Sequence, residues 1–246
     1  MKNKKLAVVT GAANGIGAAT AQMLVKDGYE VIGLDREPGK INQVTFYQVD
    51  ITKIDRHNLI LDEIESLHGP ISAFVNAAGA YTYTTVADIT HAEFYKQLSV
   101  FLDGAVFLSR SVGLRMVKRG GGRIVNVSST ASFSAMPNSF AYNTAKGGLD
   151  AATRSLALEF AAHNVLINIV APGFVRTRMS TDPVTGINEA DVDSFRALFV
   201  ESGRLPIGRT AEPEEIAGPI VFLLSERNTY ISGETLVVDG GLTSTI

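Results

Sequence analysis

The sequence predicts a single α/β domain, residues 1–246, whose parallel sheet is covered by helices on both faces in a doubly wound, three-layer arrangement. Short apolar runs rich in β-branched residues alternate with longer segments whose apolar residues recur at helical spacing. Glycine-rich or polar residues follow the ends of several of these runs. The 246 residues are about one domain's worth for this architecture, and no repeat or low-complexity segment interrupts them.

The composition excludes several classes of protein. Apolar residues make up 46% and charged residues 19%, as in a globular protein. The net charge of −3, with no Lys/Arg-rich block beyond Lys2, Lys4 and Lys5, argues against nucleic acid or an anionic membrane as a partner. The absence of Cys excludes disulfides and thiolate metal sites, and a reducing, cytoplasmic location is expected. The sequence shows no signal-peptide pattern. It also has no run of about 18 apolar residues, so no membrane span is expected.

The histidines do not suggest a metal site. His57, His68, His91 and His163 share no ligand spacing and lie on polar segments. We therefore expect all four at the surface and no bound metal.

The first expected strand, Leu6–Val9, leads through the turn TGAANGIG (10–17) into a helix over Ala18–Asp27. Glycines at such a turn let the backbone approach a pyrophosphate, and the free N–H groups of the helix N-terminus favour an anion. The spacing is Gly-x-x-x-Gly-x-Gly rather than the commoner Gly-x-Gly-x-x-Gly, and taken alone it is also that of a tight loop. The candidate nucleotide contacts are Gly11, Asn14, Gly15, Ile16 and Gly17.

The second strand, Glu30–Leu34, ends in Asp35. An acid about 20 residues beyond the glycine turn can accept hydrogen bonds from the adenosine ribose of a dinucleotide. It would also repel a 2′-phosphate, which predicts NAD as the cofactor. Arg36 favours the alternative, NADP, because a guanidinium pairs well with phosphate.

A loop is expected after Arg36, because Pro38 and Gly39 lie in a connection too short for a crossover helix. The third strand follows at Val44–Val49. Asp50 and Ile51 come directly after it and could contact the adenine.

The alternation continues with a helix over Asp55–Leu67, a strand over Ile71–Val75 and a long helix over Glu93–Val117. Small residues after this fourth strand leave room for a flat ligand, although a plain strand-to-loop turn explains them equally well. They are Asn76, Ala77, Ala78 and Gly79.

The candidate chemistry lies on the next strand and helix. Ser129 follows the apolar strand Arg123–Val127, and Tyr142 and Lys146 are one turn apart at the start of a helix over Tyr142–Phe160. A free Tyr has a pKa of about 10. An ammonium about 6 Å away would lower it by about two units at an effective dielectric of about 20. The phenol could then exchange a proton with a substrate oxygen that Ser129 holds, with a hydride carrier completing a redox reaction. Tyr-x-x-x-Lys also occurs by chance in helices, so it needs this context.

The last third is expected to contain a strand at Val165–Val170, a helix at Glu212–Leu224 and a strand at Leu236–Val238. The polar segment between, about 178–205, has a helical patch and is expected to be a mobile lid. Two sets of residues are candidates for substrate contact. Aromatic and apolar walls would come from Tyr81, Tyr83, Phe174 and Met179. A carboxylate clamp could come from Arg178, Arg196 and Arg204, although solvated charges are the commoner explanation.

These motifs together closely resemble the short-chain dehydrogenase/reductase family over essentially the whole chain. The matching stretches are TGAANGIG (10–17), Asp35, Asp50, NAAG (76–79), VNVSS (125–129), YNTAK (142–146), PGFVRT (172–177) and VDGG (238–241). The resemblance implies a Rossmann-like fold, usually a homotetramer, and hydride transfer between a nicotinamide and an alcohol or carbonyl. Within the family, the chain looks most similar to dehydrogenases that act on cyclic secondary alcohols.

The resemblance also implies residue roles. Tyr142 would be the acid/base, Lys146 would lower its pKa and bind the nicotinamide ribose, and Ser129 would orient the substrate oxygen. Thr177 would hold the carboxamide, together with the backbone of Pro172, Gly173 and Val175.

One departure from the family pattern concerns position 101. The family carries a catalytic Asn there, which holds a water that links the lysine to solvent, and this chain has Phe101. An aromatic ring cannot hold that water. We therefore keep a nucleotide-binding protein with weak or no catalysis as the alternative to an alcohol dehydrogenase, and a dehydratase or epimerase as a third possibility.

Overall fold

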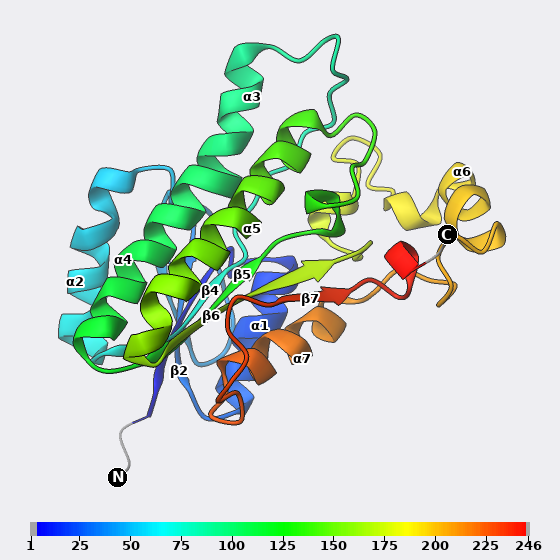
Figure 1. The fold of residues 1–246 in the computed structure, drawn as a ribbon. Coiled ribbons are helices and arrows are strands. Elements are labelled where there is room, and N and C mark those ends of the chain that lie inside the picture. Colours follow the sequence, from blue (N-terminus) through cyan, green and yellow to red (C-terminus); the bar gives the residue numbers. More distant parts are fainter. Residues whose placement is uncertain (1–3, 245–246) are drawn as a thin grey trace.

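The computed structural model describes residues 4–244 and contains one parallel sheet of seven strands with helices on both faces (Figure 1). The strand order is β3-β2-β1-β4-β5-β6-β7. The strands are β1 (Leu6–Thr10), β2 (Glu30–Asp35), β3 (Val44–Gln48), β4 (Ile71–Asn76), β5 (Gly122–Val127), β6 (Val165–Pro172) and β7 (Thr235–Val238). The order reverses between β1 and β4, and doubly wound sheets bind ligands at the carboxyl ends of the strands at such a point. The predicted α/β, Rossmann-like fold is confirmed.

The helices form two layers. They are α1 (Gly15–Lys26), α2 (His57–His68), α3 (His91–Leu98), α4 (Ala105–Lys118), α5 (Phe140–Phe160), α6 (Asp193–Phe195) and α7 (Pro213–Leu224). Helices α1 and α7 pack together on one face of the sheet, and α2, α4 and α5 cover the other (Figure 1). None of the helices within residues 4–244 is both long and apolar enough to cross a bilayer.

Strand β1 shows why the apolar runs are continuous. Leu6 and Val8 belong to the core under α2, α4 and α5, whereas Ala7 and Val9 belong to the core under α1 and α7. Successive side chains of a strand point to opposite faces, so a strand covered on both faces needs apolar residues at every position.

The long helix expected over Glu93–Val117 is interrupted. Helix α3 ends at Leu98, a π-helical segment covers Ser99–Gly104, and α4 begins at Ala105. Phe101 lies within the π-helical segment and is buried. Such segments are rare and short, so the few apolar residues of one turn do not reveal them in the sequence.

The expectation that all histidines lie at the surface is wrong for His57. Its ring is 2% exposed, and its Nε2 donates to the Ile51 carbonyl at 2.7 Å. Burial lowers the pKa of His57. His68 is partly buried and its Nδ1 contacts Glu30 at 2.6 Å, while His91 and His163 are exposed as expected.

The connection after β2 has no helix, as predicted. The 178–205 segment, coloured yellow to orange in Figure 1, lies beyond the ends of the strands and contains only short helical turns. Lys2 lies outside the described residues.

Candidate active site

A cleft with a free volume of about 150 Å³ lies at the carboxyl ends of the strands. Most of the motifs identified in the sequence contribute to its lining. The predicted residues that line it are Ile16, Ala77, Ala78, Gly79, Ser129, Tyr142, Lys146, Pro172, Gly173, Val175 and Thr177. The predicted walls Tyr81, Tyr83, Phe174 and Met179 also line it. The structure therefore brings the two parts of the predicted site together.

The turn between β1 and α1 adopts a conformation that needs glycine. Gly11 and Gly15 have φ angles of +67° and +54°, which disfavour other residues. A Cβ on Gly17 would lie 2.2 Å from the Gly11 carbonyl oxygen. Asn14 precedes the first residue of α1 as its N-cap, and its side chain makes no capping bond. The turn therefore presents backbone N–H groups of the helix N-terminus beside the cleft, as a pyrophosphate site requires.

Asp35 ends β2 with both carboxylate oxygens hydrogen-bonded. Oδ2 accepts from the Ala13 N–H and Oδ1 from the Glu37 N–H, each at 3.0 Å. The bond to Ala13 fixes Asp35 against the glycine turn. Arg36 is exposed, and its carbonyl accepts from Gln48.

Two further predicted contacts, Asp50 and Ile51, lie after β3 and away from the cleft lining. Asp50 Oδ1 accepts from the Thr52 N–H and hydroxyl, at 3.0 and 2.8 Å. Burial acts to raise the pKa of Asp50, but the bonds from Thr52 outweigh it and the pKa is lowered.

Asn76 is directed into the core rather than into the cleft. Its Nδ2 donates to the carbonyl of Ala105, to Ser109 Oγ and to Asn126 Oδ1 at 2.8–2.9 Å. These bonds tie β4 to α4 and β5. Only the backbone of Asn76 remains available to a ligand.

The backbone of the following residues is held by the first strand. Thr10 Oγ1 accepts from the N–H groups of Ala77 and Ala78, each at 3.1 Å. The small residues of this wall are therefore fixed next to the glycine turn.

Ser129 and Tyr142 meet in the cleft from β5 and α5. Ser129 is buried and its Oγ accepts from the Ala131 N–H at 3.1 Å. The Tyr142 ring lies edge-on to Tyr81 and Phe101, with centroid distances of 4.9 and 5.0 Å. Burial raises the pKa of Tyr142 to about 12, and a hydrogen bond with Ser129 only partly opposes this. The expected lowering by the nearby ammonium is therefore wrong for the free protein, because burial among aromatic rings dominates.

Lys146 is 5% exposed, and its Nζ donates to the Val127 carbonyl at 2.7 Å. Burial lowers the pKa of Lys146 to about 8, with Asp150 acting in the opposite direction. No other hydrogen bond of this Nζ is found within residues 4–244, so an ammonium has donors left for a ligand.

Phe101 lies directly beside Lys146. The ammonium nitrogen lies 4.7 Å from the Phe101 ring centroid, within range of a cation–π contact. The ring also lies against the backbone of the opposite wall, since a Cβ on Gly79 would be 2.4 Å from Phe101 Cε1. Phe101 therefore packs between that wall, Tyr142 and Lys146.

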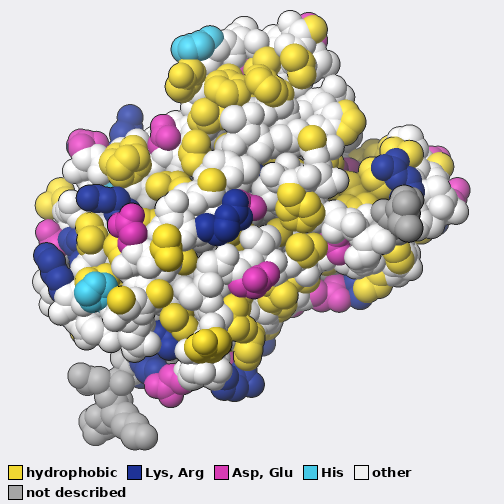
Figure 2. Space-filling model, viewed as in Figure 1, with side chains coloured by type: hydrophobic (Ala, Val, Ile, Leu, Met, Phe, Trp, Pro, Cys, Tyr) yellow, Lys and Arg dark blue, Asp and Glu magenta, His cyan; other side chains and the backbone are white. Residues whose placement is uncertain are grey.

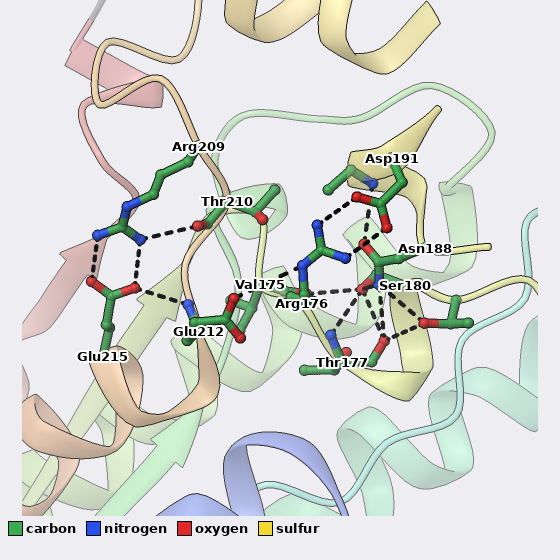
Figure 3. A network of polar contacts seen from close by, with 12 residues as sticks. Val175, Arg176, Thr177, Ser180, Asn188, Asp191, Arg209, Thr210, Glu212 and Glu215 are labelled. Carbon is green, nitrogen blue, oxygen red and sulfur yellow. Dashed lines mark hydrogen bonds and ion pairs between the residues drawn. The ribbon is translucent and has the colours of Figure 1, made fainter. Parts of the chain in front are cut away.

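A polar network fixes the first half of the 178–205 segment (Figure 3). Asn188, 7% exposed, donates through Nδ2 to the Thr177 carbonyl, Ser180 Oγ and Thr181 Oγ1 at 3.0–3.3 Å. Arg176 forms a bidentate ion pair with Asp191, in which Nη1 donates to Oδ2 and Nη2 to Oδ1, each at 2.7 Å. These contacts hold the segment next to the end of β6.

The second half of that segment is held by an aromatic cluster. Phe174, Phe195 and Phe199 have centroid distances of 4.6–4.9 Å from one another. This cluster packs the turns 193–201 against Phe174, which lines the cleft.

The predicted carboxylate clamp has no geometric basis. Arg178 pairs with Glu37 at 2.7 and 2.8 Å, and the Arg204 guanidinium lies 5.3 Å from the Phe199 ring centroid. Arg196 is exposed, and none of the three lines the cleft.

Several lining residues were not expected from the sequence, among them Thr130, Met136, Ser180, Glu189 and Leu242. Glu189 is one of many charged residues in a polar segment, and no pattern distinguishes it. Within residues 4–244, no group of three or more His, Asp or Glu residues is arranged to hold a metal ion.

Comparisons with known proteins agree with this geometry. A family model described as "Enoyl-(Acyl carrier protein) reductase" matches residues 11–243. The NAD-dependent glycerol dehydrogenase of Listeria innocua is 32% identical and aligns over 97% of this chain and 94% of its own. The cis-4-hydroxycyclohexanecarboxylate dehydrogenase of Sinomonas cyclohexanicum is 34% identical over 98% and 97%. The solved structure of ElxO with NADP bound superposes with a TM-score of 0.88 at 28% identity, covering 98% of this chain and 100% of its own.

Proposed function

Because this chain belongs to the short-chain dehydrogenase/reductase family, and is therefore an oxidoreductase of CH–OH and keto groups, we propose that it oxidises a secondary alcohol or reduces the matching ketone through Tyr142. One observation carries the proposal. Ser129, Tyr142 and Lys146 converge in one cleft beside the small residues 77–79 and the glycine turn. A protein that only bound a nucleotide would need no such convergence.

The cleft fits the nicotinamide cofactor that the family uses. The glycine turn admits a pyrophosphate, the small wall residues admit a flat ring, and Lys146 keeps donors for a ribose. We propose that Pro172, Gly173, Val175 and Thr177 complete the nicotinamide end. When bound, the cofactor would supply or accept the hydride.

The residues of the chain would manage the proton. Ser129 would hold the substrate oxygen, and Tyr142 would give a proton to it or take one from it. With a pKa of about 12 in the free protein, Tyr142 is protonated and suited to donate. To act as a base it needs the ammonium form of Lys146, whose own pKa of about 8 makes that form available near neutrality.

The activity can be tested with a panel of cyclic and acyclic secondary alcohols and ketones, followed by nicotinamide absorbance with NAD(H) and NADP(H). The aromatic walls favour a ring-shaped substrate, and the Sinomonas relative acts on one by its name. Tyr142→Phe removes only the hydroxyl and is expected to lower kcat by about 10²–10⁴. Cofactor binding without turnover of any compound would favour the alternative of a nucleotide-binding protein, for which Phe101 is the supporting observation.

We propose NAD rather than NADP, because Asp35 would repel a 2′-phosphate at the end of β2. The glycerol dehydrogenase relative uses NAD by name, whereas the ElxO structure holds NADP, so the relatives alone do not decide. Asp35→Ala is expected to reduce the preference for NAD, with Arg36 then free to receive the phosphate. Tighter binding of NADP than of NAD by the unchanged protein would contradict this assignment.

We further propose a homotetramer. Large apolar side chains are exposed on the outer faces of α4 and α5, namely Phe107, Leu114 and Leu158. Hydrophobic side chains are visible on the face of the molecule shown in Figure 2. Sedimentation at a mass of 26.2 kDa, that of one chain, would refute the proposal.

A further inference from the structure

The acidic side chain of Glu189 lies in the substrate part of the cleft, where neither the motifs nor the family resemblance assigns a role. Among the lining residues within 4–244, it is the only carboxylate and Lys146 is the only Lys or Arg. The Lys146 ammonium is buried at the reacting end, against Val127 and Phe101. The outer part of the cleft therefore carries one negative charge and no positive charge to balance it.

The chain fixes Glu189 from both sides. Asn188 before it is tied to Thr177, Ser180 and Thr181, and Asp191 after it is paired with Arg176 (Figure 3). The Asn188 side chain also accepts from the Ala190 N–H at 3.1 Å, which caps the short turn that contains Glu189. The carboxylate is thus presented by a built turn rather than by a free loop.

The hydrogen bonding of Glu189 is incomplete. Oε2 accepts from the Tyr83 hydroxyl at 3.0 Å, while Oε1 has no hydrogen-bond partner within the part of the chain that the structure describes. Burial raises the pKa of Glu189, and only the bond from Tyr83 opposes this. An arginine or lysine partner, which would ordinarily accompany a half-buried carboxylate, is absent from the lining.

The surroundings of Glu189 are aromatic. Tyr83 packs edge-on against Tyr81 at 4.4 Å, and Tyr81 in turn packs against Tyr142 at 4.9 Å. The rings connect Glu189 to the reacting hydroxyl through one continuous wall. Aromatic faces beside a carboxylate suit a ring or chain that ends in a hydrogen-bond donor.

We propose that Glu189 selects the substrate of the alcohol dehydrogenase activity proposed above, by accepting a hydrogen bond from a donor group remote from the reacting carbon and by repelling carboxylates. The donor is a hydroxyl or an ammonium group. A carboxylate would enter against Glu189 with no cation to pair with, which places anionic alcohols among the poor substrates. This reverses the sequence-based hypothesis of a carboxylate clamp.

Four ring alcohols of similar shape test the proposal: 4-aminocyclohexanol, cyclohexane-1,4-diol, cyclohexanol and 4-hydroxycyclohexanecarboxylate. kcat/KM is measured with the cofactor-saturated enzyme at slightly alkaline pH, where the carboxylate of Glu189 is ionised and the amine is still protonated. The amino alcohol is expected to exceed the carboxylate by about tenfold or more, the effect of one charge interaction at short range. Glu189→Gln is expected to reduce this ratio to near one, and cyclohexanol, which carries no remote donor or charge, serves as the reference substrate.

Two further variants separate selection from a structural role. Glu201→Gln makes the same change at an exposed position of the 178–205 segment outside the cleft lining, and is expected to keep the wild-type ratio. Tyr83→Phe removes the hydrogen bond but keeps the charge, so it is also expected to keep the preference for the amine. The proposal would be overturned if the ratio of kcat/KM for the amine to that for the carboxylate were the same in the wild type and in Glu189→Gln. It would also be overturned if Glu201→Gln lowered this ratio as much as Glu189→Gln does.

The test also distinguishes this proposal from the proposed activity. If none of the four alcohols is oxidised, the activity fails, and the same four compounds are titrated into the protein–NADH complex by calorimetry. Tighter binding of the amine than of the carboxylate, lost in Glu189→Gln, would still support selection by Glu189. Binding without that order, or no binding of any of the four, would overturn it.

Discussion

The aromatic ring of Phe101 covers one side of Lys146. The family resemblance places there an amide that holds a water. The ring is 2% exposed and lies 4.7 Å from the Lys146 ammonium and against Gly79. A cation–π contact stabilises an ammonium but transfers no proton. The structure therefore holds Lys146 against a side chain that can neither donate nor accept a proton.

Phe101→Asn is expected to raise kcat while leaving the cofactor Kd unchanged, because an amide can hold a water beside Lys146. The pKa of Lys146 should rise toward its ordinary value as the site becomes wetter. Loss of the buried ring should cost roughly 3 kcal/mol or more of stability. Steady-state kinetics, cofactor titration and chemical unfolding measure the three effects.

Phe101→Leu serves as the matched control, since it shortens the side chain without adding a polar group. It should lose stability without gaining kcat. A wild-type enzyme that is already fast, and no faster as Phe101→Asn, would show that the proton leaves by another route.

Because folding lowers the pKa of Lys146, we expect the stability of the protein to depend on pH. This pKa falls from 10.5 to about 8 on folding, so between these values the unfolded chain binds more protons than the native one. Stability should therefore rise with pH across this window, by at most about 3 kcal/mol. Above pH 10 the raised pKa of Tyr142 acts in the opposite direction, because the unfolded phenol loses its proton first.

Unfolding free energies of the wild type and Lys146→Met, measured by denaturant between neutral pH and about 10, check this prediction. The wild-type curve should rise relative to that of the variant. Parallel curves would show that Lys146 is not desolvated in the native protein.

The sequence predicted which residues meet in the cleft better than it predicted their pKa values. Ser129, Tyr142 and Lys146 converge as expected because a strand end and one helix turn fix their positions. The pKa of Tyr142 depends instead on the rings of Tyr81 and Phe101, which come from distant segments. Side-chain burial by non-local neighbours has no signature in spacing along the chain.

At the scale of elements, strands and helices were predictable where burial imposes a regular spacing of apolar residues along the chain. Strands covered on both faces are continuously apolar, and α5 repeats its small and apolar residues along one face. The π-helical segment Ser99–Gly104 and the turns of the 178–205 segment were not predictable in the same way. They depend on Phe101 fitting against Gly79 and on the bonds of Asn188, which are individual contacts.

Asn188→Ala is expected to loosen the turn that carries Glu189. The change removes a buried amide whose Nδ2 lies within hydrogen-bond distance of three acceptors and whose Oδ1 accepts one bond, and it leaves Ser180 and Thr181 without that partner. The KM for substrate should rise by roughly tenfold, while the cofactor Kd changes little. Limited proteolysis should cut the 178–205 segment faster than in the wild type.

Asp191→Asn provides the comparison for that prediction. Its ion pair with Arg176 is largely exposed, and exposed pairs contribute little. A larger effect on KM for Asp191→Asn than for Asn188→Ala would contradict the assignment of Asn188 as the main anchor.

At the scale of the molecule, the parallel sheet explains why residues far apart in the sequence form one site. Gly11, Asp35, Ser129 and Pro172 all lie at or just after the carboxyl end of a strand, and these ends share one edge. The fold was predictable for the same reason, since alternating strands and helices permit few topologies. The homotetramer expected from the family resemblance stays a prediction.

The ion pair between Glu37 and Arg178 joins the loop after β2 to the segment after β6, with distances of 2.7 and 2.8 Å. Nearby, the side chain of Thr177 rests on the glycine turn, 3.2 Å from where a Cβ of Gly15 would lie. These two contacts join the loop after β2 and the glycine turn to the segment after β6, and we therefore expect entry of the dinucleotide to require a preceding opening step.

Stopped-flow mixing should then show an observed rate that levels off at high cofactor concentration, at the rate of opening. Glu37→Gln and added salt should both raise that plateau by about twofold, because the ion pair is exposed. A strictly linear concentration dependence would mean that the dinucleotide enters a cleft that is already open.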